Sequence, residues 1–331
     1  MANRVLVTGA AGFIGAHAAA ALHDGGWHVL ACDNFNPYYS PQLKHDRVAA
    51  LLTPRGIACA AVDISDAPAL NALFAQHQPS HVLHLAAQAG VRHSLVDPGA
   101  YVQSNLVGFG HVLEACRHGQ VQHLAYASSS SVYGARNQTP FRETDAVTQP
   151  TSLYAATKAA NELMAHSYAH LFALPSTGLR FFTVYGPWGR PDMAYFSFAR
   201  NIRAGQPITL FAGGELQRDF TYIADVVQAI TQLLAQPAPA LRPELQLAAP
   251  HTVCNIGNRQ PVTVLEFVRL LEAALGRKAQ LQFAPMQPGD VPLTSADTTR
   301  LKAWTGFEPH TPLGEGLKTF ARWLEGWEPL V

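Results

Sequence analysis

A glycine-rich turn near the start of the chain restricts its possible folds more than any other feature. Residues 3–9, NRVLVTG, form a short apolar run that is typical of a buried strand, and residues 13–25 follow with a helical pattern. Between them, Gly9, Gly12 and Gly15 keep a G-x-x-G-x-x-G spacing. Glycine permits a tight turn and a close backbone approach, and the N-terminus of the helix stabilises a pyrophosphate. We therefore expect a dinucleotide site at this first strand–helix junction.

Strand and helix patterns alternate through the first half of the chain. We expect strands at 3–9, 27–33, 56–64, 81–87, 123–129 and 176–182, separated by helices at 13–25, 42–52, 67–76, 98–118 and 152–172. Such alternation gives parallel strands with right-handed crossovers and helices on both faces of the sheet. The predicted fold class is therefore α/β, with a Rossmann-type doubly wound parallel sheet.

After residue 193 the alternation becomes irregular. We expect helices at 194–204, 223–235, 262–276 and 312–326, with one short strand at 207–211. This less regular half predicts a smaller C-terminal lobe over the carboxyl edge of the sheet, where folds of this class bind their ligands.

Charge and cysteine content exclude several classes of function. The formal net charge over 331 residues is zero, so there is no overall basic field to attract nucleic acid or a membrane surface. No apolar run reaches the roughly 18 residues of a transmembrane helix, and the N-terminus enters a strand pattern without a signal peptide. The four cysteines lie far apart without CxxC spacing, which argues against a disulfide framework or a metal site. We therefore expect a soluble cytoplasmic protein.

Acidic and small residues at the ends of later strands extend the expected cofactor site. Asp33 ends the second strand, where its carboxylate accepts hydrogen bonds from ribose hydroxyls and repels a 2′-phosphate, so NAD is favoured over NADP. Asp63 follows the third strand and is expected near adenine. The small residues of LAAQAG (85–90) follow the fourth strand and allow the cofactor to lie against the backbone.

A tyrosine and a lysine stand four positions apart in SLYAATK, residues 152–158. Such pairs occur by chance on many helices. Here the helix follows the serine-rich end of the fifth strand, ASSSSVYG (127–134), so Tyr154 and Lys158 are expected at the nicotinamide half of the crevice. A free phenol has a pKa near 10, and a neighbouring ammonium favours its phenolate form. We expect this phenolate to take the proton of an alcohol while hydride leaves to NAD.

Together these motifs resemble the extended short-chain dehydrogenase/reductase family, and the resemblance covers essentially the whole chain. Longer stretches are similar to the UDP-glucuronate 4-epimerases within that family: DNFNPYYSPQLK (33–44), SLYAATKAANELMAHSY (152–168), RFFTVYGPWGRPDMA (180–194), RDFTYIADV (218–226) and MQPGDV (286–291). The resemblance implies an NAD-dependent epimerase that interconverts UDP-glucuronate and UDP-galacturonate through a transient 4-keto intermediate, often as a homodimer. It also implies a Rossmann domain at 1–182 plus about 219–258, and a smaller substrate-binding domain at 183–218 and about 259–331.

Site residues follow from this resemblance by matching position. Ser129, Tyr154 and Lys158 would be catalytic. The cofactor set is Gly9, Gly12, Phe13, Ile14, Gly15, Asp33, Asn34, Asp63, Ile64, Leu85, Ala86, Ala87, Gln88, Asn105, Ser128, Tyr154, Lys158 and Val184. The substrate set is Arg92, Ser129, Ser130, Ser131, Thr183, Arg190, Phe211, Arg218, Gln287 and Asp290. Within it, Arg218 is expected to meet the diphosphate, Phe211 to pack on uracil and Arg190 to help the keto intermediate react onward.

Three related reactions and one binding role compete with this assignment. Sugar-nucleotide 4,6-dehydratases usually place Asp-Glu beside the catalytic Ser or Thr, where this chain has Ser130-Ser131, so dehydration is disfavoured. UDP-glucuronate decarboxylases share the 4-keto intermediate, whose carboxylate an epimerase must hold out of alignment for loss of CO₂. UDP-glucose/galactose 4-epimerases typically carry Asn at the position of Thr183. A non-catalytic NAD-binding sensor is the alternative from another class.

Overall fold

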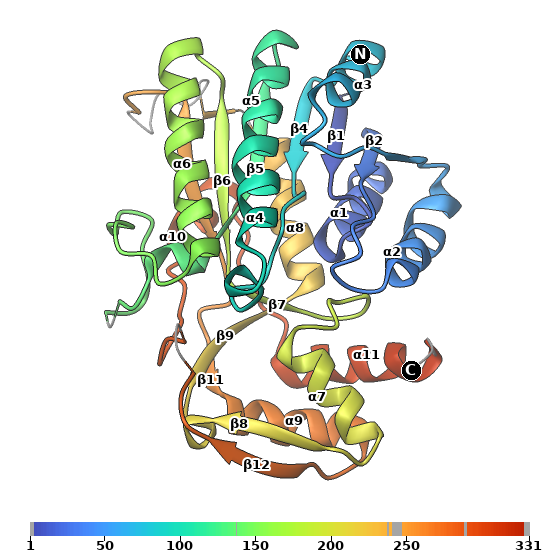
Figure 1. Cartoon of the computed structure of the whole chain (residues 1–331), viewed down its shortest axis with the longest axis vertical. Helices are drawn as coiled ribbons and strands as arrows, with labels where there is room; N and C mark the ends of the chain where they lie inside the picture. Colours follow the sequence, from blue (N-terminus) through green and yellow to red (C-terminus); the bar gives the residue numbers. More distant parts are fainter. Residues whose placement is uncertain (1–2, 137, 237, 240–246, 288–289, 328–331) are drawn as a thin grey trace.

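The computed structural model describes residues 3–136, 138–236, 238–239, 247–287 and 290–327, and it confirms the predicted fold class (Figure 1). Among these residues, seven parallel strands form a central sheet in the order β10-β6-β5-β4-β1-β2-β3. The strands are β1 (Arg4–Thr8), β2 (His28–Asp33), β3 (Cys59–Ala61), β4 (His81–His84), β5 (His123–Ser129), β6 (Ser176–Phe181) and β10 (His251–Ile256). The order runs outward in both directions from β1, which is the doubly wound arrangement.

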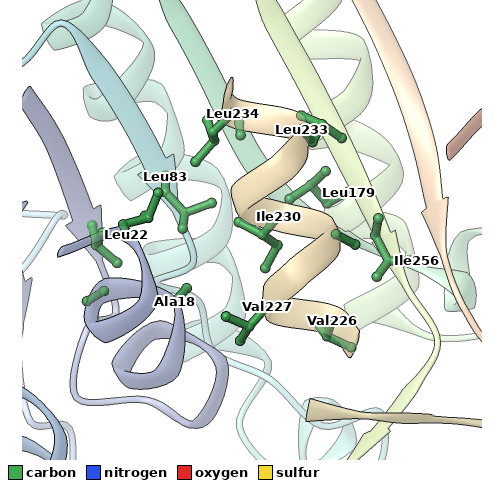
Figure 2. Close-up of a cluster of buried hydrophobic side chains, with 14 of the residues drawn as sticks. Ala18, Leu22, Leu83, Leu179, Val226, Val227, Ile230, Leu233, Leu234 and Ile256 are labelled. Carbon is green, nitrogen blue, oxygen red and sulfur yellow. The ribbon is translucent and has the colours of Figure 1, made fainter. Parts of the chain in front are cut away.

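Helices cover both faces of this sheet. One face carries α1 (Phe13–Asp24), α8 (Ile223–Ala235) and α10 (Thr299–Thr305); the other carries α3 (Ala67–His77), α5 (Phe109–His118) and α6 (Leu153–Phe172). Figure 2 shows the first face, where Val227 and Ile230 of α8 lie between Leu22 of α1 and Leu179 of β6. Burying each such side chain stabilises the fold by roughly 1.5–3 kcal/mol relative to leaving it exposed.

Shorter helical segments lie between these elements. The helix predicted at 98–118 is divided into α4 (Pro98–Tyr101), the π-helical η4 (Val102–Gly108) and α5, and the helix predicted at 42–52 into α2 (Pro41–Arg47) and the π-helical η1 (Val48–Leu52). The remaining turns are η2 (Thr53–Arg55), η3 (His93–Leu95), η5 (Ser130–Tyr133) and η6 (Ala212–Gly214).

A smaller lobe lies beyond the carboxyl ends of the central strands (Figure 1). It contains a sheet in the order β11-β9-β7 and a parallel pair β12-β8. These strands are β7 (Thr183–Tyr185), β8 (Pro207–Phe211), β9 (Gln217–Tyr222), β11 (Pro261–Thr263) and β12 (Gln280–Ala284). Their helices are α7 (Ala194–Arg203), α9 (Val264–Leu275) and α11 (Leu313–Gly326). Aromatic rings fill the core of this lobe, and Phe220 stacks on Phe267 at a centroid distance of 4.7 Å.

The expectation of a single strand after the sixth was wrong, because the structure adds β7, β9, β10, β11 and β12. Of these, β10 returns to the central sheet beside β6, with His251 opposite Ser176. We propose the domain division expected from the sequence, since the segments assigned to the substrate-binding domain contribute their strands to the two small sheets. Residues 219–222 are the exception: the division assigns them to the Rossmann domain, but they are part of β9, which lies in a small sheet of the other lobe.

Candidate active site

A cavity of about 460 Å³ runs along the carboxyl ends of the central strands, where residues of the sheet and of the smaller lobe meet. It is lined by all of the predicted site residues except three, which are Asn105, Phe211 and Gln287. Positions as distant in the sequence as Gly9 and Asp290 therefore border one space, as expected for a ligand site at the carboxyl edge of an open α/β sheet.

The glycine turn has no room for side chains. Gly9 has a φ of +70°, and a Cβ on it would lie 2.6 Å from the backbone nitrogen of Ala86. A Cβ on Gly15 would lie 2.0 Å from the carbonyl oxygen of Gly9. Among the described side chains, none caps α1 at Gly12, so the first N–H groups of the helix are open to an anion. The turn therefore fits a pyrophosphate.

Asp33 is held at the edge of this turn. Its carboxylate accepts hydrogen bonds from the backbone N–H of Ala11 at 3.1 Å and of Phe35 at 2.8 Å. The ammonium of Lys44 lies 3.7 Å from the same carboxylate, and both side chains are buried. Lys44 thus offsets part of the charge that was expected to repel a 2′-phosphate, a contact that the sequence motif did not reveal.

Two other residues of the predicted cofactor set are fixed by hydrogen bonds. Asp63 accepts a hydrogen bond from the side chain of Asn34 at 2.8 Å and lines the cavity beside it. Asn105 lies behind the lining, where its side-chain oxygen accepts from the backbone N–H of Gln88 at 2.8 Å and its amide donates to the Gln88 carbonyl at 3.0 Å. Asn105 therefore shapes the turn after β4 instead of lining the cavity.

The residues expected to be catalytic meet at the end of β5. Tyr154 and Lys158 are one turn apart on α6, and Ser129 is the last residue of β5. The Lys158 ammonium donates a hydrogen bond to the Ala127 carbonyl at 2.9 Å. The Ser129 hydroxyl accepts from the backbone N–H of Ser131 at 3.1 Å, which fixes its position. The cavity thus has a phenol, an ammonium and a hydroxyl at one end.

Opposing influences act on the pKa of the Tyr154 phenol. Burial raises the pKa of Tyr154, while a hydrogen bond with Ser129 and the positive charge of Arg190 lower it. Burial also lowers the pKa of Lys158 to about 8. Arg190 is thus a second cation near Tyr154, besides the Lys158 expected from the sequence to favour the phenolate.

Two arginines that line the cavity share one carboxylate. Arg92 and Arg218 each place a guanidinium nitrogen 3.8 Å from Asp290. Phe211 does not line the cavity but packs under Arg92, with the guanidinium 5.4 Å from the ring centroid. Gln287 lies behind Asp290, and its buried Oε1 has no hydrogen-bond partner among the described residues. The paired arginines form a cationic end that suits a diphosphate.

The segment after β2 contributes residues that the sequence analysis did not assign. Tyr38, Tyr39 and Lys44 line the cavity, and the Tyr38 hydroxyl donates to Asp192 at 3.0 Å. Asp192 in turn accepts from the guanidinium of Arg190 at 3.0 Å. These positions lie inside the stretches that carry the family resemblance, but no spacing rule predicts a contact between them.

Metal clusters and membrane-spanning helices are both missing from the described part of the chain. It holds no cluster of three or more His, Cys, Asp or Glu side chains placed to bind a metal ion. Within that same part, no helix combines the length and the hydropathy that a bilayer crossing needs.

Known proteins match the chain over nearly its whole length. Residues 5–257 match the NAD dependent epimerase/dehydratase family. A probable UDP-glucuronate 4-epimerase of Rhizobium meliloti (strain 1021) is 46% identical over 330 residues, which cover 97% of both chains. UDP-glucuronate 4-epimerase 1 of Arabidopsis thaliana is 48% identical over 96% of this chain and 76% of that protein. A solved UDP-glucuronic acid 4-epimerase of Bacillus cereus, in complex with UDP-glucuronic acid and NAD, superimposes with a TM-score of 0.88 at 32% identity, covering 98% of this chain and 99% of that one.

Proposed function

The chain belongs to the NAD dependent epimerase/dehydratase family, and we propose that it interconverts UDP-glucuronate and UDP-galacturonate. The sugar is oxidised at C4 to a transient 4-keto intermediate and then reduced from its opposite face. The observation that carries this reaction type is that Ser129, Tyr154 and Lys158 border the same cavity as the glycine turn. The uronate is supported by relatives named UDP-glucuronate 4-epimerase at 46–48% identity over 96–98% of this chain.

NAD is the cofactor, and when bound it supplies the hydride acceptor and donor. The backbone of the turn at Gly9, Gly12 and Gly15 would hold its pyrophosphate, because close contacts exclude side chains there and the start of α1 is uncapped among the described residues. Asp33 would accept hydrogen bonds from the ribose hydroxyls, since its backbone partners already fix the carboxylate at the cavity edge.

The residues at the end of β5 would move the proton. Tyr154 acts as a base in its phenolate form and takes the proton of the C4 hydroxyl, then returns a proton when the keto group is reduced. The hydrogen bond with Ser129 and the charge of Arg190 both favour that form by lowering the pKa of Tyr154. Ser129 orients the C4 oxygen, and its own position is fixed by the N–H of Ser131.

An epimerase of a uronic acid must also protect its intermediate. A 4-keto uronate is a β-keto acid, and it loses CO₂ when the carboxylate bond aligns with the carbonyl π system. Thr183, Ser130 and Ser131 line the cavity and would hold the carboxylate out of that alignment through short hydroxyl groups. A UDP-glucuronate decarboxylase and a UDP-glucose/galactose 4-epimerase are the alternative enzymes.

Product analysis distinguishes these reactions. Purified protein incubated with UDP-glucuronate is expected to give UDP-galacturonate, recognised in the proton NMR spectrum by inversion at C4 of the sugar. A UDP-pentose with release of CO₂ would instead identify a decarboxylase. Parallel incubations with UDP-glucose and UDP-xylose test neutral sugars, and a faster reaction with UDP-glucose than with UDP-glucuronate would contradict the uronate assignment.

We also propose that the protein is a homodimer that associates through α5, α6 and the adjoining η4. These elements lie on one face of the molecule, with α5 and α6 side by side (Figure 1). Their surface carries several exposed apolar side chains: Leu163 is 72% exposed and Leu171 64%, with Val102 and Val107 also exposed on η4. Exposed apolar side chains gathered on neighbouring helices support an interface there.

Light scattering after size exclusion measures this association. We expect twice the mass of one chain for the wild type and a monomer for Leu163→Glu, because a buried unpaired carboxylate disfavours the interface. Leu281→Glu is the control, since Leu281 is exposed on β12 in the other lobe. A monomeric wild type at micromolar concentration would refute the dimer.

We further propose that the protein works in the cytoplasm. Cys32, Cys59, Cys116 and Cys254 are all free thiols in the structure, and cytoplasmic proteins keep their thiols reduced. Alkylation of freshly extracted, denatured protein should therefore modify all four cysteines, whereas a native disulfide would contradict this location.

A further inference from the structure

Arg47 is a completely buried cation beside the active site, with an exposed fraction of 0%. Its guanidinium donates to the carbonyls of Trp188 at 2.7 Å, Gly189 at 2.8 Å and Ala11 at 3.1 Å, and to the hydroxyl of Tyr39 at 2.7 Å. Every hydrogen bond described for this guanidinium thus ends on a neutral oxygen, and none on a carboxylate. Burying a charge without an ionic partner is costly, so these hydrogen bonds are what compensates for it and they hold the guanidinium in place.

The carbonyl partners of Arg47 belong to two segments that both contribute residues to the cavity, namely the glycine turn and the loop 186–193. Ala11 lies inside the glycine turn, whereas Trp188 and Gly189 directly precede Arg190. One side chain at the end of α2 therefore links the backbone of the dinucleotide cradle to the loop that carries Arg190.

The loop 186–193 needs such a support because its backbone is strained. Trp188 has a φ of +62°, a conformation that costs a bulky residue roughly 1–3 kcal/mol. A Cβ on Gly189 would lie 1.5 Å from the hydroxyl of Tyr195, so the backbone is tightly packed there as well. The guanidinium of Arg47 binds the carbonyl oxygens that this conformation turns inward.

A second contact ties the stretch 34–47 to the same loop. The Tyr38 hydroxyl donates to Asp192, and Asp192 accepts from Arg190. Tyr38 and Arg47 belong to the stretch between β2 and η1, while Asp192 and Arg190 belong to the loop. The stretch 34–47 thus holds the loop at both of its halves.

This support bears on catalysis through the surroundings of Tyr154. The groups that face Tyr154 are Ser129 from β5, Arg190 from the loop and Lys158 one turn further along α6. Tyr101 from α4 also packs against it, with 6.1 Å between the two ring centroids. Arg190 is the cation that lowers the pKa of Tyr154 against burial. Displacing the loop would remove that charge.

We propose that Arg47 is a positioning residue, which holds the loop 186–193 and thereby keeps Arg190 over the reacting end of the cavity by tying it to the glycine turn. Filling the cradle and placing Arg190 are then coupled, because both depend on the same guanidinium. The kinetic consequence rests on the epimerase function proposed above, whereas the structural consequence does not.

Hydrogen exchange tests the structural part without any assay of activity. In Arg47→Met with retained cofactor, we expect the amides of 186–193 to exchange about tenfold faster than in the wild type. Tyr38→Phe removes only the second contact and should accelerate the same amides by a smaller factor, which keeps the test open if Arg47→Met folds poorly. Arg203→Met is the control, because Arg203 at the far end of α7 donates to the Leu324 carbonyl of α11, and its removal should leave the loop unchanged.

The pH dependence of turnover tests the kinetic part. Losing a cation raises the pKa of a phenol, so the acidic limb of the kcat profile should move upward by about one pH unit in Arg47→Met and in Arg190→Met. The double variant should show no further shift, because both changes remove the same charge. Additive shifts of the acidic limb, or unchanged hydrogen exchange of the loop amides in Arg47→Met, would overturn the proposal.

Absence of any epimerisation by the wild type would refute the proposed function. The hydrogen-exchange result would then still decide whether Arg47 holds the loop.

Discussion

Tyr154→Phe is expected to lower turnover by about 10²–10⁴-fold and to leave the amount of retained NAD unchanged. The substitution removes only the hydroxyl that would accept the C4 proton, and the edge contact of the ring with Tyr101 stays available. The rate of C4 inversion is measured by NMR, and the retained nucleotide is quantified after denaturation. A large loss of rate with full cofactor content places the defect in the proton transfer.

Tyr168→Phe is a matched control for this experiment. Tyr168 is on the same helix, and its hydroxyl donates to Glu114 at 2.6 Å, away from the cavity. We expect its turnover to equal that of the wild type. A non-catalytic NAD sensor would show no turnover in the wild type or in either variant. If the wild type is active and Tyr154→Phe turns over as fast as Tyr168→Phe, Tyr154 is not the base.

The first half of the fold follows from sequence pattern because strand and helix patterns alternate through it with clear turn signals between them. The apolar run at the start of the chain and the turn signals after it predict β1 and α1 within two residues of their observed ends. The second half is different, since β7 and β11 have only three residues each and carry no periodicity of their own. These two strands form because each pairs with β9, which lies between them in the sheet. No local sequence pattern predicts that pairing.

The candidate site shows the same division. Glycine spacing and the Tyr–Lys pair identify residues that do line the cavity, because topology alone brings strand ends to one edge. The contact between Tyr38 and Asp192 spans 154 positions, so it becomes visible only when the two lobes are in place. The charge effect of Arg190 on Tyr154 was missed for the same reason: the helical spacing of Tyr154 and Lys158 is visible in the sequence, whereas the position of the loop that carries Arg190 is not.

Removal of a buried charge beneath this site should have the largest effect on stability. Glu162 on α6 and Arg180 on β6 form a two-pronged ion pair at 2.9 and 2.7 Å, with exposed fractions of only 6% and 3%. Glu162 also accepts from the hydroxyl of Ser128 at 2.5 Å, next to Ser129. We expect Glu162→Gln to lower the free energy of unfolding by about 3–5 kcal/mol, because it leaves the Arg180 charge buried and unpaired.

Urea unfolding at a fixed, saturating NAD concentration measures this loss, since bound cofactor itself stabilises the folded state. Glu315→Gln is the control, because Glu315 pairs with Lys318 on the surface of α11 and both side chains are exposed, so we expect no measurable change. In the double variant Glu162→Gln/Arg180→Met no charge remains buried, and the protein should regain part of the stability that Glu162→Gln alone removes. A double variant less stable than the sum of the two single ones would instead mean that the surrounding polar network, including the bond from Arg180 to the Tyr133 hydroxyl, stabilises the fold more than the uncompensated charge destabilises it.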